Sequence, residues 1–151
     1  MGTLIIPDGT EFICNHSFAG GSDITGAVVP DSVTEIGVGA FADCVNLEKV
    51  VLGKSLTRLK KEVFSGCEKL SSINIPDGLT SIGEWAFRGC TSLRELKIPD
   101  SVTEICAEAF MDCPNLKIIA NEGSYAAEFA GNAEFVGTAD FAGRFSSAGK
   151  E

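Results

Sequence analysis

Residues 29–47 read VPDSVTEIGVGAFADCVNL, and this stretch decides the fold because the chain repeats it. Residues 75–93 read IPDGLTSIGEWAFRGCTSL, and residues 98–116 read IPDSVTEICAEAFMDCPNL. Phe, Cys and Leu hold the same places in every copy. The chain is therefore built from an internal repeat, and a unit of roughly 20 to 50 residues indicates a solenoid.

The repeat has a fixed period of 23 residues. Because no insertion breaks this count, residues one period apart should lie above one another in successive coils. No single coil can bury its own aromatic ring, so stacking supplies the core. The columns that result are Phe18, Phe41, Phe64, Phe87 and Phe110; Cys44, Cys67, Cys90 and Cys113; Leu47, Leu70, Leu93 and Leu116; and Ile13, Ile36, Leu59, Ile82 and Ile105.

Each unit combines a short strand, a turn, a second short extended piece and one helical turn. Residues 50–52 show the β-branched apolar pattern of a strand, and Pro-Asp dipeptides such as Pro76-Asp77 are typical of turns. Strands one period apart should pair in parallel, about 4.8 Å from each other. The sequence thus predicts an α/β solenoid: a right-handed coil of about five 23-residue repeats with a parallel sheet on the concave face.

The predicted organisation has four parts: an edge strand over residues 1–6, repeats over 7–121, a cap over 122–136 and a flexible tail or linker over 137–151. In the cap, Ser124 should begin a short helix over 125–130, with a final extended piece over 133–136. The helix should cover the last coil with Tyr125, Ala126 and Phe129. In the tail, Phe141 and Phe145 are either loosely packed or part of a segment that docks on a neighbour.

Composition limits the possible partners. The 151 residues include 12 basic and 21 acidic side chains, for a net charge of −9. A phosphate backbone or an anionic membrane surface needs a positive field, so we expect no nucleic-acid partner. No apolar run is long enough to span a bilayer, and the first residues show no signal peptide.

The residue types that usually carry chemistry do not converge here. The stacked cysteines form a line, which suits neither a disulfide nor a four-ligand metal site, so we expect buried thiols that bond weakly to backbone carbonyls. Cys14 and Cys106 share another column but lie four coils apart. His16, the only histidine, is near Cys14 but has no third group to orient it. We therefore expect no enzyme, no cofactor and no catalytic or metal-binding residues.

A column of aspartates follows the prolines, with Lys54 in its middle place. Like charges on neighbouring strands repel, and Lys54 should relieve Asp31 and Asp77 on either side of it. Asp77 and Asp100 remain adjacent, which leaves two interpretations: a site for a hard cation such as Ca²⁺, or hydrated carboxylates that bond their own turns.

The outward positions of the predicted concave sheet form the candidate binding surface. Its three columns are Ile5, Val28, Val51, Asn74, Lys97 and Ala120; Gly26, Lys49, Ser72, Glu95 and Ile118; and Thr25, Glu48, Ser71, Arg94 and Lys117. The first column starts with an apolar strip, and basic side chains lie along the face. A mixed apolar and basic surface suits a protein partner. Trp85, outside these columns, either anchors an interface or covers its own coil.

Residues 4–121 resemble the leucine-rich repeats of the BspA-like class, also called the Treponema-type repeat, through phrases such as IPDSVTEI and AFADCVNL. Residues 121–136 also resemble the way such arrays end. The resemblance implies a bacterial surface or secreted protein that binds another protein, with a role in adhesion. The contact residues we expect are Val28, Lys49, Val51, Asn74, Arg94 and Lys97. The alternative is a structural spacer or scaffold that self-associates through its N-terminal edge or its C-terminal tail.

Overall fold

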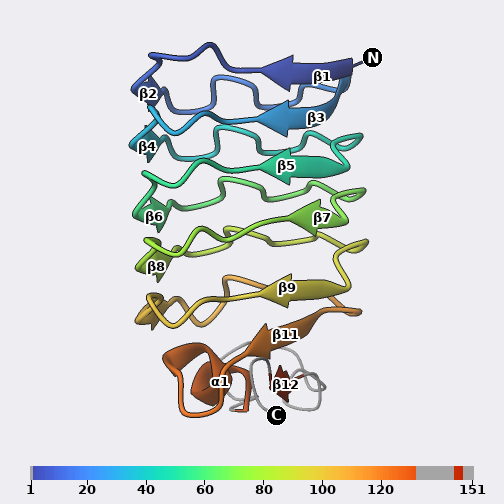
Figure 1. The fold of residues 1–151 in the computed structure, drawn as a ribbon. Helices are drawn as coiled ribbons and strands as arrows, with labels where there is room; N and C mark the ends of the chain where they lie inside the picture. Colours follow the sequence, from blue (N-terminus) through green and yellow to red (C-terminus); the bar gives the residue numbers. More distant parts are fainter. Residues whose placement is uncertain (1, 132–144, 148–151) are drawn as a thin grey trace.

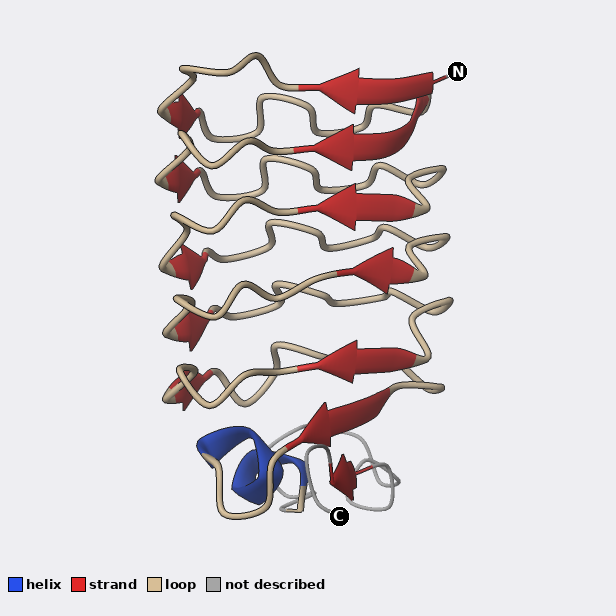
Figure 2. Cartoon of the chain, in the orientation of Figure 1, coloured by secondary structure: helices blue, strands red, loops and turns tan. Residues whose placement is uncertain are grey.

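The computed structural model describes residues 2–131 and 145–147. The chain winds as a stack of coils, and each coil places one longer strand on one side of the stack and one short strand on another side (Figure 1). Loops make up most of the rest of each coil (Figure 2). The solenoid predicted from the 23-residue period is thus confirmed.

The longer strands are parallel and hydrogen-bonded in the order β1-β3-β5-β7, while β9, β11 and β12 form a separate sheet. Their bounds are β1 Gly2–Ile5, β3 Ile24–Val28, β5 Lys49–Val51, β7 Ser72–Ile73, β9 Glu95–Lys97, β11 Lys117–Ala120 and β12 Phe145–Ser147. The short strands form the pair β2–β4 and the sheet β6–β8–β10. Their bounds are β2 Phe12–Ile13, β4 Glu35–Ile36, β6 Arg58–Leu59, β8 Ser81–Ile82 and β10 Glu104–Ile105.

The aromatic column forms the centre of the core. Successive rings from Phe18 to Phe110 are stacked, with centroids 5.3 to 5.6 Å apart and interplanar angles of 11° to 20°. Phe41 and Phe64 are fully buried. Offset stacking of this kind adds to the free energy that area burial alone contributes. The column therefore both excludes water and keeps successive coils in register.

The predicted helical turn of each coil is a chain of tight turns instead. In the second coil, Ala40 donates to the Gly37 carbonyl and Ala42 to the Gly39 carbonyl. Alternate amides reach the next coil, as when Phe41 donates to the Val63 carbonyl at 2.9 Å and Asp43 donates to the Ser65 carbonyl. Because half of the backbone donors bond between coils, a continuous helix cannot form there.

The long-strand sheet is interrupted between β7 and β9, which belong to different hydrogen-bonded sheets. Asn74 follows directly after β7. Its side-chain amide accepts from the Leu52 N–H at 2.7 Å and donates to the Leu52 carbonyl at 2.9 Å. Beyond the last backbone pair of β5 and β7, the Asn74 side chain thus makes the two hydrogen bonds to Leu52 that a strand backbone would otherwise make.

The last coil corrects two sequence predictions. Ile118 and Ala120 were expected on the outward face, but they are 0% and 1% exposed. The register explains this, because Ile118 pairs with Leu96 and Ile119 pairs with Lys97, one residue short of the 23-residue period. Removing one residue from a strand moves every following side chain to the other face.

Helix α1, Tyr125–Ala130, closes the described part of the stack. Ser124 caps it, accepting from the Ala127 N–H at 3.2 Å, and Ala126 and Phe129 are buried as expected. Phe129 meets Phe110 edge to face, with ring centroids 6.1 Å apart. Tyr125 is 39% exposed, but its hydroxyl accepts from the Ile105 N–H at 3.4 Å.

Part of the segment expected to be a tail forms a strand. Residues 145–147 are β12, which pairs in parallel with β11. The extended piece expected over 133–136, the residues 137–144 and 148–151 of the expected tail, and Phe141 lie outside the described residues.

Candidate binding surface

The N-terminal half of the long-strand face holds a hollow of about 410 Å³. Three of the six predicted contact residues, Val28, Lys49 and Val51, line it. They come from β3 and β5, which pair through Val28 and Val51. The other residues of its lining are Thr3, Thr25, Gly26, Ala27 and Glu48.

Gly26 explains why this sheet has a hollow. It lies between Thr3 and Lys49 in the outward column, because the register pairs it with both. A Cβ atom at this position would be 3.0 Å from Oγ1 of Thr3 and 3.6 Å from the Lys49 carbonyl oxygen. The missing side chain therefore leaves space above the sheet, with a threonine and a lysine as its walls.

A second hollow of about 480 Å³ lies at the ends of β1 and β3. Both hollows share Val28, and the second also contacts Ile5, Asp8 and Asp31. The strip of Ile5, Val28 and Val51, called the apolar strip below, thus has a hollow on each side of it. Ile5 is 68% exposed and Val51 is 41% exposed. Exposed branched side chains between two hollows are typical of a protein-binding surface.

The other three predicted contact residues lie further along the stack. Lys97 and Arg94 are exposed on or beside β9, beyond the interruption of the sheet. Asn74 is exposed as well, but both ends of its amide are bonded to the backbone of Leu52. The structure therefore brings Val28, Lys49 and Val51 together and does not bring the other three to the same place.

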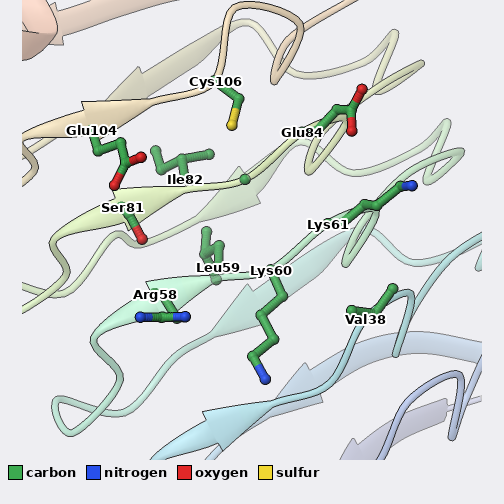
Figure 3. Close-up of a pocket in the computed structure, with 11 residues that line it drawn as sticks. Val38, Arg58, Leu59, Lys60, Lys61, Ser81, Ile82, Glu84, Glu104 and Cys106 are labelled. Carbon is green, nitrogen blue, oxygen red and sulfur yellow. The ribbon is translucent and has the colours of Figure 1, made fainter.

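A third hollow lies on a different face, over the short strands, and the sequence analysis did not predict it. It measures about 470 Å³ and lies over β6 and β8, as Figure 3 shows. Basic residues of one coil and acidic residues of the next two coils line it: Arg58, Lys60, Lys61, Glu84 and Glu104. The signal was in the column of Cys14, Gly37, Lys60, Gly83 and Cys106, where two glycines alternate with side chains.

The backbone of the preceding coil leaves little room for a side chain at Gly83. A Cβ atom there would be 3.0 Å from the Leu59 carbonyl oxygen, closer than most real contacts allow. The same column has Lys60 one coil earlier, and its ammonium group pairs with the Glu35 carboxylate. This ion pair, with Arg58 nearby, holds the pKa of the Glu35 carboxyl below its usual value.

The cysteine column behaves as predicted. Each thiol donates to a phenylalanine carbonyl: Cys44 to Phe18 at 3.1 Å, Cys67 to Phe41 at 3.2 Å, Cys90 to Phe64 at 3.3 Å and Cys113 to Phe87 at 2.9 Å. All six cysteines are free thiols. Burial raises the pKa of Cys44, Cys67 and Cys90. A thiol with a raised pKa is a poor nucleophile, so this column is part of the core rather than a reactive site.

His16 and Cys14 do not form a catalytic pair. His16 is exposed, and its ring lies over Gly39 of the next coil, where an added Cβ would be 2.5 Å from its Nδ1 atom. Cys14 is exposed too, and its carbonyl accepts from the Ser17 hydroxyl. Neither side chain is oriented toward the other by a third residue that the structure describes.

Two members of the aspartate column, Asp31 and Asp100, bond to the next coil. The Asp31 carboxylate accepts from the Lys54 backbone N–H at 2.9 Å, and Asp100 accepts from the Asn121 side chain at 3.1 Å. Within residues 2–131 and 145–147, no cluster of three or more His, Cys, Asp or Glu could hold a metal ion. The same part of the chain has no helix long and apolar enough to cross a bilayer.

Trp85 packs within the stack and contacts residues of three successive coils. The Lys61 ammonium lies 5.4 Å and the Arg88 guanidinium 5.0 Å from the centre of its ring. The indole N–H donates to the Glu108 carboxylate at 3.1 Å. These contacts join three coils and satisfy both the ring face and the indole nitrogen.

The geometry of the stack agrees with a comparison of the sequence with known families. The BspA type leucine rich repeat region matches residues 1–120 in six copies. The chain belongs to this family. The matched residues contain six strands of the long-strand side, β1, β3, β5, β7, β9 and β11. The resemblance that the repeated phrases indicated is thereby confirmed.

Solved structures of leucine-rich repeat proteins are similar to this one. They include a leucine rich cell surface protein from Faecalibacterium prausnitzii (40% identity, TM-score 0.78, 82% of this chain and 33% of that one). A leucine-rich repeat protein from Bacteroides ovatus has 35% identity and a TM-score of 0.73, covering 78% of this chain and 33% of that one. One from T. pallidum has 31% identity and a TM-score of 0.74, covering 78% and 57%. This chain therefore spans about a third to just over half the length of these relatives. No curated protein matches the chain.

Proposed function

We propose that this BspA-type repeat binds a protein partner through the N-terminal half of its long-strand face. The observation that supports this most is the apolar strip, in which Ile5 and Val51 are exposed and the half-buried Val28 lines two hollows. The partner contributes apolar side chains to the hollows, while Lys49 and Glu48 at the rim make polar contacts. No bond is made or broken, so the protein is a binding module rather than an enzyme.

A position at the cell surface is part of the same proposal. It is supported by the relative from Faecalibacterium prausnitzii, which is described as a cell surface protein. An adhesive role would follow if the bound partner belongs to another cell. The chain of the relative is about two and a half times as long, so the present residues supply one section of a binding surface.

Selection from a displayed library of random peptides tests the binding surface directly. Peptides are selected on the wild-type protein, and their affinity is then measured for the variant Ile5→Ser/Val51→Ser. We expect at least a tenfold loss, because two exposed apolar anchors are removed. The matched control, Glu11→Ser/Glu62→Ser, alters two side chains away from this face and should bind as wild type. Selected peptides that bind all three proteins equally would contradict the proposed surface.

A further inference from the structure

The hollow on the short-strand face is lined by opposite charges on its two sides. Arg58, Lys60 and Lys61 lie in one coil, whereas Glu84 and Glu104 lie in the next two. Figure 3 shows the nitrogen atoms of the basic side chains on one side of the hollow and the carboxylates on the other. Lys60 is paired with Glu35, the Lys61 ammonium lies over the Trp85 ring, and Glu84 is half-buried. Arg58 and Glu104, both exposed, are therefore the main charges that this face offers to a partner.

The strand register makes this arrangement symmetric about Ser81. Arg58 pairs with Ser81, and Ser81 pairs with Glu104, in neighbouring parallel strands. Arg58 and Glu104 thus lie on opposite sides of Ser81, each about 4.8 Å away along the stack. A two-fold axis at the level of Ser81, lying in the plane between two such faces and perpendicular to the stack, therefore places Arg58 of one copy opposite Glu104 of the other.

We propose that this face pairs with a second copy of the chain, with the two stacks antiparallel. Arg58 of each copy then meets Glu104 of the other, which is the self-complementary contact of an isologous dimer. The hollow beside Gly83 gives the incoming arginine room, because that position has no side chain and Glu84 and Glu104 line the cavity. Arginine suits such a contact since its guanidinium can bind a carboxylate with two hydrogen bonds.

Because the chain is strongly acidic, the Arg58–Glu104 contacts determine which faces of two copies can associate. Two copies with a charge of −9 each repel one another, so they associate only where opposite charges meet. The contact covers a few strands, and an interface of that size is weak and transient. The dimer therefore forms at high protein concentration and is weakened by salt. It uses a different face from the proposed partner site and does not depend on it.

Charge reversal tests the pairing. Sedimentation velocity is measured from about 10 µM to about 1 mM protein, a range suited to a weak interface. We expect the wild type to dimerise within this range and to dissociate in about 0.5 M NaCl. Arg58→Glu and Glu104→Arg each place like charges together and should raise the dimer dissociation constant at least tenfold. The double variant Arg58→Glu/Glu104→Arg restores opposite charges and should return it to within about threefold of wild type.

Two controls keep the test specific. Lys97→Glu makes the same kind of charge reversal on the long-strand face and should leave the dimer unchanged, and thermal melting establishes that every variant is folded. A wild type that stays monomeric throughout would overturn the proposal. So would a dimer that survives both single reversals, or a folded double variant that remains monomeric. If a reversal prevents folding, Arg58→Gln and Glu104→Gln replace it, and each should weaken the dimer at least threefold.

Discussion

The thiol of Cys67 donates a hydrogen bond to the carbonyl oxygen of Phe41, 3.2 Å away and one coil back. The same contact recurs along the cysteine column, so each thiol satisfies a carbonyl of the turn that carries the stacked ring. A small apolar side chain with a weak donor fits this buried place. The column therefore links the coils through the turns as well as through the rings.

Thiol accessibility should divide the cysteines into distinct classes. Cys14 is exposed and should react within seconds to minutes with a disulfide reagent at pH 8, while Cys106, partly buried, should react more slowly. Burial, with Glu104 and Glu84 close by, raises the pKa of Cys106 and slows it further. Cys44, Cys67, Cys90 and Cys113 should react only in denaturant. Mass spectrometry of the labelled peptides measures this, and rapid labelling of Cys67 in the native protein would contradict the buried column.

Stability should fall at alkaline pH because of the same thiols. The pKa of Cys67 is raised in the folded state, so above about pH 8.5 the unfolded chain loses a proton that the folded chain retains. Each such thiol then lowers the free energy of unfolding by about 1.4 kcal/mol per pH unit. Cys67→Ala lacks the contribution of this one thiol. The difference in the free energy of unfolding between wild type and variant should therefore shrink as pH rises from about 8.5 to 10. Urea unfolding at several pH values measures the difference, with Cys14→Ala as the exposed control.

The aromatic stack should depend on every ring within it. Phe64 is fully buried between two stacked rings with centroids 5.6 Å away on each side. Phe64→Ala should therefore lower the free energy of unfolding by about 3–5 kcal/mol. Phe12, which is 60% exposed, is the matched control, and Phe12→Ala should cost less than about 1 kcal/mol. Equal losses for both variants in urea unfolding would contradict the central place of the stack.

Asn74 should matter more for stability than its exposure suggests. Its amide makes two hydrogen bonds to the Leu52 backbone beside the gap between β7 and β9. Asn74→Ala leaves both groups without this partner and should cost about 1–3 kcal/mol, at about 0.5–1.5 kcal/mol for each bond. Lys97→Ala, one period further on, should change stability by less than about 0.5 kcal/mol. A selective role in binding, with no loss of stability in Asn74→Ala, would contradict this structural assignment.

Sequence alone could predict the stack because its residues act as a column. Phe41 and Phe64 must be neighbours once the period is fixed, and the parallel strands and thiol contacts follow from that. Where the spacing between paired residues departs from 23, as between β9 and β11, adding 23 residues assigns side chains to the wrong face. Ile118 and Ala120 were assigned by strict addition of 23 residues, although the local alternation from Leu116 already places both of them inward.

The candidate surfaces were harder to predict because absent side chains create them. The apolar strip was readable from Ile5 and Val51, but the hollow beside it depends on Gly26 and on the way its neighbours lean. Gly83 plays the same part on the short strands. Hydropathy patterns identify what projects from a sheet and give no measure of the space between projecting groups. The use of the Asn74 amide within the fold was equally hidden, since an asparagine at an outward position of a strand pattern does not reveal that it bonds the Leu52 backbone.

The C-terminal end of the stack should open when its cap is weakened. Helix α1 has six residues, too few to persist alone, so it is held by packing of Phe129 against Phe110. Phe129→Ala removes that contact, and since repeat arrays are stabilised by contacts between neighbouring units, the last coil should fray before the middle ones. We expect faster hydrogen exchange over 117–130 and unchanged exchange over 41–64. Tyr125→Phe, which loses only a 3.4 Å hydrogen bond, is the control. If exchange rose equally in every coil, the array would open as one cooperative unit, and the cap would stabilise the whole stack rather than its end.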